Sequence, residues 1–154
     1  MLWDAALAVA REQLGAREQP PGSKRTPATL WYGLLCPYSV VFACYCYAQA
    51  GSRAFQPQQR YAFAPYLYDD ARRGLSYLSL TNEPLRGDLA LFAGLSGEAE
   101  RVAFFDGWQS EHERQDFDAI EADIGYGGEL AGEGAVARTS RLRAEAIGFV
   151  HVRA

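Results

Sequence analysis

The stretch from Cys36 to Gly51 constrains the fold most, because nearly all of it is apolar and both of its ends carry helix-boundary signals. Pro37 suits a first helical turn and stops a preceding helix from continuing, and Ser39 is a good N-cap residue. Gly51 is placed to end the helix in the left-handed conformation. A helix that is apolar on most sides is buried against several neighbours, so we expect the central helix of the protein here.

Length and charge limit the classes of protein to consider. The chain has 154 residues, enough for one domain with a proper core, so we expect residues 1–154 to form a single domain. The net charge of −4 argues against a nucleic-acid partner, because phosphate binding needs a basic face. No segment approaches the length of a membrane span, and the amino terminus lacks the basic and apolar regions of a signal peptide. We therefore expect neither a membrane partner nor a secretion signal.

Three cysteines, Cys36, Cys44 and Cys46, lie within eleven positions of one another. Cys44 and Cys46 are two apart on the expected helix and face different ways, which argues against a bridge between them. The chain has no Cys/His spacing typical of zinc, so no metal or other cofactor is expected. The cysteines are interpreted as small buried hydrophobic residues of a reduced protein.

The rest of the chain predicts helices first and strands afterwards. Residues 2–14 have the periodicity of an amphipathic helix, and residues 17–26 have the composition of a loop. Residues 69–73 are expected to finish a short helix that Gly74 ends. The expected strands are 89–92, 102–105, 117–121, 136–140 and 147–152. This order predicts an α+β fold in which a small antiparallel sheet packs on the central helix.

Connections between the expected strands follow from turn-forming residues. Asp106-Gly107 is a good turn dipeptide and should end the second strand. The expected loops are a hairpin at 94–100, a polar exposed loop at 108–116 and a glycine-rich loop at 125–134.

Tyr45-Cys46 followed by Gln49-Ala50-Gly51 resembles the nucleophile helix of the CHAP and NlpC/P60 peptidoglycan hydrolases, the papain-like amidases and endopeptidases of many phage lysins. Gly87-Asp88 before an expected strand resembles another motif of that family. The loop after the first helix also matches in part, at Gly15, Glu18, Pro21, Ser23, Arg25, Thr26 and Trp31-Tyr32-Gly33. The resemblance covers nearly the whole chain and implies a papain-like fold.

The resemblance places Ser39 where the family has its catalytic cysteine and Arg101 where it has its catalytic histidine. It implies Glu121 or Asp123 as the residue that would orient that histidine. A guanidinium stays protonated and cannot accept the nucleophile's proton. Loss of one triad member alone can cost on the order of a million-fold in rate. We therefore expect no catalytic residues: Ser39 would be an N-cap, and Arg101 would pair with Glu100, Glu121 or Asp123.

Two other arrangements of possible site residues follow from the sequence. Cys36 precedes the central helix, and a Cys36–His112 dyad would need the loop around His112 to fold back over the helix start. A groove for glycan or peptide would use aromatic side chains, and core or rim packing explains the same residues at least equally well. The aromatic residues in question are Trp31, Tyr32, Trp108 and Tyr126.

A domain that keeps its fold without its chemistry is kept for its surface, which predicts a non-enzymatic component of a phage virion. Its partners would be other virion proteins or copies of itself, through exposed aromatic residues in 56–68 and 108–134. Two alternatives are a module that binds peptidoglycan in the old cleft and an active amidase or endopeptidase with a rearranged site. Fold and viral origin do not by themselves give function.

Overall fold

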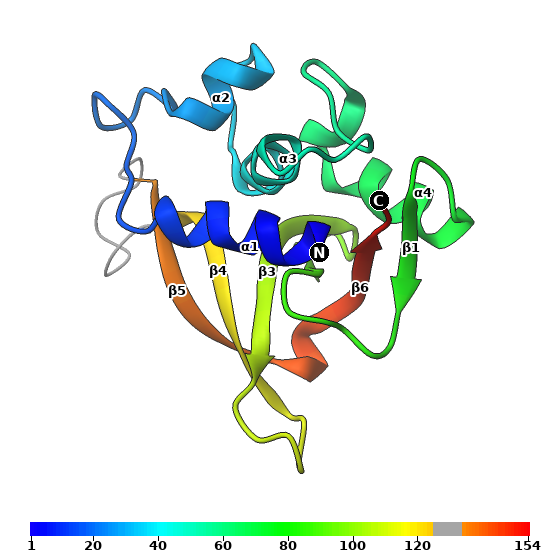
Figure 1. Ribbon diagram of the computed structural model, residues 1–154. Helices are drawn as coiled ribbons and strands as arrows, with labels where there is room; N and C mark the ends of the chain where they lie inside the picture. Colours follow the sequence, from blue (N-terminus) through cyan, green and yellow to red (C-terminus); the bar gives the residue numbers. More distant parts are fainter. Residues whose placement is uncertain (125–133) are drawn as a thin grey trace.

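The computed structural model describes residues 1–124 and 134–154 and has an α+β architecture (Figure 1). Helices come first in the chain and strands follow, as predicted. The helices are α1 (Leu2–Glu12), α2 (Pro27–Tyr32), α3 (Ser39–Gln49) and α4 (Ala64–Arg73), with short 3₁₀ turns at Arg60–Ala62 and Arg143–Glu145. The strands are β1 (Leu78–Thr81), β2 (Leu89–Ala93), β3 (Ala99–Trp108), β4 (Asp116–Ile124), β5 (Ala135–Leu142) and β6 (Ala146–Val152).

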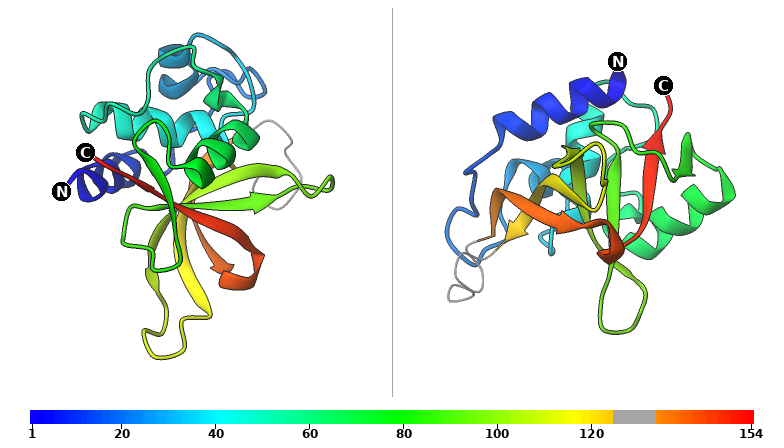
Figure 2. Two further views of the ribbon diagram at one scale, coloured as in Figure 1. Left: turned by 90° about the vertical axis from the view of Figure 1, so that its right-hand side faces the viewer. Right: turned by 90° about the horizontal axis from the view of Figure 1, so that it is seen from below.

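All six strands belong to one antiparallel sheet with the order β1-β6-β2-β3-β4-β5. Strands β2 to β5 form a meander, whereas β6 returns across the sheet and lies between β1 and β2. Figure 2 shows that the sheet is strongly twisted and that the helices gather over one side of it. The outer strands of the sheet are β1 and β5.

Helix α3 is the central helix, as its apolar sequence predicts. It lies between α1, α2 and the sheet, where Figure 1 shows it nearly end-on, and Val41, Cys46 and Tyr47 are fully buried. Gly51 has a φ of +93° and ends the helix as predicted. The amide of Gly51 donates to the carbonyl of Ala48, and the next amide donates to the carbonyl of Tyr47, which is the Schellman pattern.

Strand β3 contributes to two separate apolar clusters, one on each face of the sheet. Phe104 packs against Phe42 and Tyr47 of α3 on the helical side. Phe105 belongs to a second cluster, rich in aromatic side chains, on the other face of the sheet. The members of this second cluster are Ala90, Phe92, Ala103, Phe105, Phe117, Ala119 and Phe149, with Trp108 and Ala146 packed against it.

The turn predicted at Asp106-Gly107 is wrong, because β3 continues through both residues to Trp108. The left-handed Gly107, at φ +103°, lies where the β3–β4 register shifts, so a conformation typical of turns forms an irregularity inside the strand. Asp106 is held in place within β3, because Arg11 and Arg138 both donate to its buried carboxylate. Tertiary contacts therefore override the local turn preference.

Other element bounds differ in extent from the prediction. Residues 69–73 finish helix α4, and Gly74 ends it, both as predicted; the helix begins at Ala64 and has a proline in its first turn. Helix α2 was not predicted; Thr26 and Thr29 form a capping box at its start. The short strand β1 was also missed. The expected glycine-rich loop at 125–134 falls almost wholly outside the described residues.

Candidate functional site

A pocket of about 360 Å³ lies at the start of α3, between this helix, the α4 region and one end of the sheet. Its walls are mostly apolar, and its polar groups come from β3, β4, the first residue of α3 and the segment before that helix. The lining residues are Leu34, Cys36, Pro37, Ser39 and Val40; Ala62, Phe63, Ala64 and Pro65; Ala99, Glu100 and Arg101; and Asp123. Ser39, Arg101 and Asp123, three of the positions expected from the sequence, therefore meet at one place.

Ser39 is the first residue of α3 and not its N-cap, so that prediction is wrong. The N-cap is Tyr38, and no side chain among the described residues caps the helix. The Ser39 hydroxyl donates to the carbonyl of Val102 at 3.0 Å and accepts from the Val102 amide at 2.9 Å. Both bonds are buried, so this hydroxyl ties the start of α3 to the backbone of β3.

We expect Ser39→Ala to lower the free energy of unfolding by about 2 kcal/mol, because it leaves the buried Val102 amide and carbonyl without that partner. Urea unfolding monitored by circular dichroism measures the change. Ser96→Ala, in the exposed β2–β3 loop, is the matched control and should change stability by less than about 0.5 kcal/mol. Equal stabilities of the two variants would contradict the structural role of Ser39.

Arg101 pairs with Glu121, one of the three partners left open by the sequence. Its guanidinium donates to the Ala122 carbonyl at 2.8 Å and lies 3.4 Å from the Glu121 carboxylate. Glu121 is fully buried and is held mainly by other groups, accepting from Arg141 at 2.7 Å on each oxygen and from Thr139 at 2.6 Å. A permanent cation therefore occupies the position where the family resemblance implies a base.

Burial alone would raise the pKa of Glu121. The hydrogen bonds from Arg141 and Thr139, with the charges of Arg141 and Arg101, outweigh burial and hold that pKa below its usual value. Glu121 is therefore ionised at neutral pH and serves as a buried counter-ion for two arginines.

Asp123, which also lines the pocket, belongs to a different ion pair. The Lys24 ammonium lies 2.9 Å from one carboxylate oxygen, and the backbone amide of Tyr38 donates to the other at 3.1 Å. Asp123 thereby fixes the loop before α3 to the end of β4. Its backbone has a φ of +62°, a conformation that aspartate tolerates better than most residues.

Cys36 is the one cysteine that lines the pocket, and its thiol is not activated. Burial raises the pKa of the Cys36 thiol above its ordinary value, and the charge of Asp123 raises it further while Lys24 lowers it. Only the thiolate is a strong nucleophile. Cys44 and Cys46 are buried free thiols, as predicted, and burial raises the pKa of both. The prediction of burial is wrong for Cys36, which is only partly buried because it lines the pocket.

We expect iodoacetamide at pH 7 to label one cysteine of the folded protein, Cys36, more slowly than it labels free cysteine, because of the raised pKa. Labelling should accelerate as the pH rises above 9, and all three thiols should react in denaturant. Mass spectrometry of the labelled peptides provides the readout, with Cys36→Ala as the control. Labelling faster than that of free cysteine at pH 7 would contradict the environment described here.

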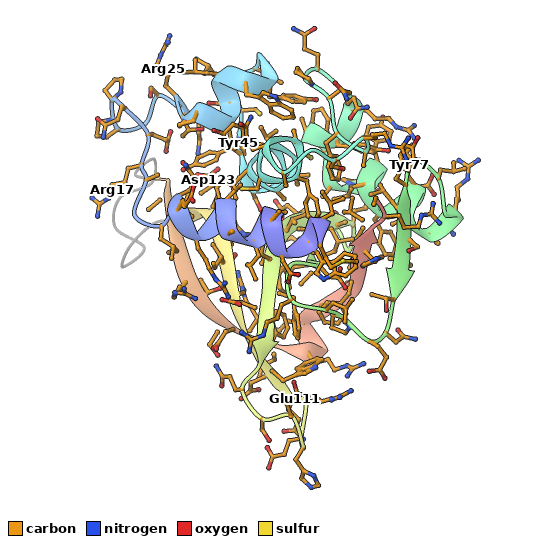
Figure 3. The ribbon with its side chains drawn as sticks, viewed as in Figure 1. Arg17, Arg25, Tyr45, Tyr77, Glu111 and Asp123 are labelled. Atoms are coloured by element: carbon orange, nitrogen blue, oxygen red, sulfur yellow. The ribbon has the colours of Figure 1, made fainter. Side chains whose placement is uncertain are left out.

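The structure rules out a Cys36–His112 dyad. His112 lies in the connection between β3 and β4, at the far end of both strands from the pocket. Figure 3 shows Glu111, the neighbour of His112, at the lower tip of the molecule, well away from Asp123 of the pocket, which lies beside the helices. From Arg101 to Trp108 alone, β3 spans roughly 20 Å at the usual rise of a strand.

The aromatic residues considered as a binding groove do not converge. Trp31 and Tyr32 belong to α2; Tyr32 is buried and Trp31 packs edge-on against Tyr45. Trp108 packs on Phe105 in the cluster on the opposite face of the sheet. Trp31, Tyr32 and Trp108 therefore serve in packing, and none of the three lines the pocket. Tyr126 lies outside the described residues.

Sequence reasoning missed a second polar arrangement, between His151 of β6 and Asp88 at the start of β2. The imidazole Nδ1 lies 2.8 Å from the buried Asp88 carboxylate, and the centroids of the His151 and Trp3 rings are 4.9 Å apart. Burial raises the pKa of Asp88, whereas the Leu85 amide and His151 act in the opposite direction. The Leu85 amide donates to the Asp88 carboxylate at 2.8 Å, which stabilises the turn before β2. The pair joins β6, β2 and α1.

Comparison of the chain with family models, with curated proteins and with solved structures gives no significant match. Within residues 1–124 and 134–154, no three His, Cys, Asp or Glu side chains gather in a way that would hold a metal ion. In the same residues, no helix has the length and apolar character needed to cross a membrane.

Proposed function

We propose that this chain is a papain-like domain of the CHAP and NlpC/P60 type that has lost its chemistry and acts as a binding or structural component of a phage particle. The family resemblance supplies the fold type and the viral setting. The arrangement of the pocket supplies the argument for lost catalysis, and it involves three elements: the start of α3, β3 and β4.

The observation that carries the proposal is the set of contacts made by Ser39 and by Arg101 of β3. In the described part of the chain, the Ser39 hydroxyl makes two hydrogen bonds, both with the backbone of Val102, the residue after Arg101. Arg101 in turn contacts Glu121 on β4. The start of α3, β3 and β4 thus meet in the arrangement that a nucleophile, a base and an orienting residue require. The residues present at these positions cannot carry out that chemistry.

The test is incubation of the purified protein with purified peptidoglycan, beside an active CHAP lysin at equal concentration. Turbidity should stay constant with this protein and fall with the lysin. Clearing by this protein would overturn the proposal. Clearing that persists in the Ser39→Ala and Cys36→Ala variants would mean, in addition, that an unrecognised residue is the nucleophile.

Centrifugation of the same mixture separates two kinds of non-enzymatic role. A virion subunit should stay in the supernatant and should be found by mass spectrometry in phage particles banded on a density gradient. Protein that pellets with intact peptidoglycan and is absent from the particles would favour the cell-wall-binding alternative, for which the retained pocket is the supporting observation.

A further inference from the structure

The guanidinium of Arg101 has an N–H donor that no residue in the described part of the chain accepts. Its Nε is buried and has no acceptor among the residues that the structure describes. Its ion-pair partner Glu121 is shared with Arg141, which takes both carboxylate oxygens at shorter distance than Arg101 does. Two guanidinium groups thus share one carboxylate, and Arg101, about one-third exposed, is the one that lines the pocket.

The acidic side chains of the pocket do not neutralise Arg101. Asp123 is engaged by Lys24 and by the Tyr38 amide. The carboxylate of Glu100 lies beside Gly94 of the β2–β3 connection, and in the described part of the chain it makes no ion pair with Arg101. An anion entering the pocket would therefore find a guanidinium available for a charge-assisted hydrogen bond.

Two further features of the same pocket agree with a ligand that is anionic at one end and apolar elsewhere. Ser39 and Val40, in the uncapped first turn of α3, line the pocket, and a helix N-terminus favours negative charge. The rest of the wall is apolar, and Leu34 and Phe63 are 49% and 63% exposed at its edge. Apolar walls with a few convergent polar groups are characteristic of small-ligand sites.

We propose that this pocket binds a carboxylate carried on a small apolar body, such as the carboxyl end of a peptide, with Arg101 as the partner of the carboxylate. Leu34 and Phe63 then contact the apolar part. This assignment rests on the proposed function, because it takes the pocket as a binding site and not as a catalytic one. The volume of about 360 Å³ accommodates one side chain with its terminal carboxylate.

The test uses ¹⁵N-labelled protein and two probes that differ only in charge, N-acetyl-L-phenylalanine and N-acetyl-L-phenylalaninamide. Titration of the acid should shift the amide signals of residues 39–41 and 99–101, and the amide probe should bind at least ten-fold more weakly. Equal affinities, or shifts confined to other regions, would overturn the proposal. A third probe, 3-phenylpropionate, separates the sources of the carboxylate: weaker binding than the acetylated acid favours a peptide end, and equal binding favours a small free acid.

Variants assign the carboxylate to its partner. Arg101→Met should lose at least ten-fold in affinity for the acid and nothing for the amide probe, while Arg101→Lys should keep part of the preference for the acid. Arg114→Met, in the exposed β3–β4 connection, is the matched control and should bind as the wild type does. Unchanged binding of the acid by Arg101→Met would overturn the proposal, and unshifted signals of the second aromatic cluster verify that the variant is folded.

The peptidoglycan assay separates this failure from failure of the proposed function. A protein that neither clears peptidoglycan nor distinguishes the two probes would keep the non-catalytic assignment and lose the carboxylate site. A protein that clears peptidoglycan would lose the non-catalytic assignment whatever the probes do.

Discussion

Glu121→Gln is expected to lower the free energy of unfolding by about 3 kcal/mol at pH 7. The substitution removes a fully buried negative charge and leaves the guanidinium groups of Arg141 and Arg101 without their shared counter-ion. Breaking one partner of a buried ion pair typically costs about 3–5 kcal/mol, and the partial exposure of both arginines favours the lower end. Urea unfolding of the two proteins measures the difference.

The pH dependence of that difference identifies the charge as its cause. The folded-state pKa of Glu121 is lowered, so its contribution is present above the unfolded value of about 4.3 and is lost as the pH falls through the folded value. The stability gap between wild type and Glu121→Gln should therefore narrow as the pH falls from 5 towards 3. A gap that is constant over this range would mean that packing, and not ionisation, causes the loss.

Asp69→Asn is the control for charge removal at the surface. Asp69 is 41% exposed and pairs with Arg72 one turn along α4. Exposed pairs of this kind contribute little to stability because water and salt screen them, so the loss should be clearly smaller than that of Glu121→Gln. Similar losses in both variants would contradict the special role of the buried carboxylate.

Gly87→Ala is expected to cost at least about 4 kcal/mol or to prevent folding. A Cβ atom at Gly87 would lie 2.2 Å from the backbone carbonyl oxygen of Trp3, and the φ of +99° is unfavourable for any residue with a side chain. Relieving the overlap would separate α1 from the turn before β2. It would also disturb the Gly87 carbonyl, which accepts the buried hydroxyl of Tyr47 at 2.6 Å.

Gly22→Ala separates the clash from the conformational cost. Gly22 has a similar φ of +82°, but no heavy atom lies within 4 Å of the position of an added Cβ. The control should lose only about 1–2 kcal/mol, which is the usual cost of a left-handed conformation for alanine. Thermal unfolding of both variants provides the comparison, and equal losses would refute the close packing of Trp3 on Gly87.

The apolar pattern of a segment predicted its burial better than local turn residues predicted its ends. The stretch that forms α3 could be recognised because its burial follows from its own composition. Strand β1 could not, since its four residues become a strand only by pairing with β6, some seventy positions away. Asp106-Gly107 misled for a related reason: the arginines that hold Asp106 come from α1 and β5, and nothing in the local sequence indicates them.

The candidate site was predictable in its positions and not in its contacts. The family resemblance brought Ser39, Arg101, Glu121 and Asp123 to one region, and the structure places them there. That the Ser39 hydroxyl bonds to the backbone of Val102 depends on how closely α3 approaches β3, which the sequence does not specify. The division of partners, with Arg101 on Glu121 and Lys24 on Asp123, likewise depends on side-chain distances across the sheet.

The place of β6 in the sheet has a consequence for biosynthesis. Because β6 lies between β1 and β2, β1 has no strand partner and β2 lacks one of its two until residues 146–152 have left the ribosome. Until then the nascent chain holds β2 to β5 as a meander whose edge at β2 is open in addition to its edge at β5, and β1 is unpaired. Open strand edges invite association with other chains, so we expect the emergence of β6, which covers the β2 edge and pairs β1, to lower the tendency of the nascent chain to aggregate.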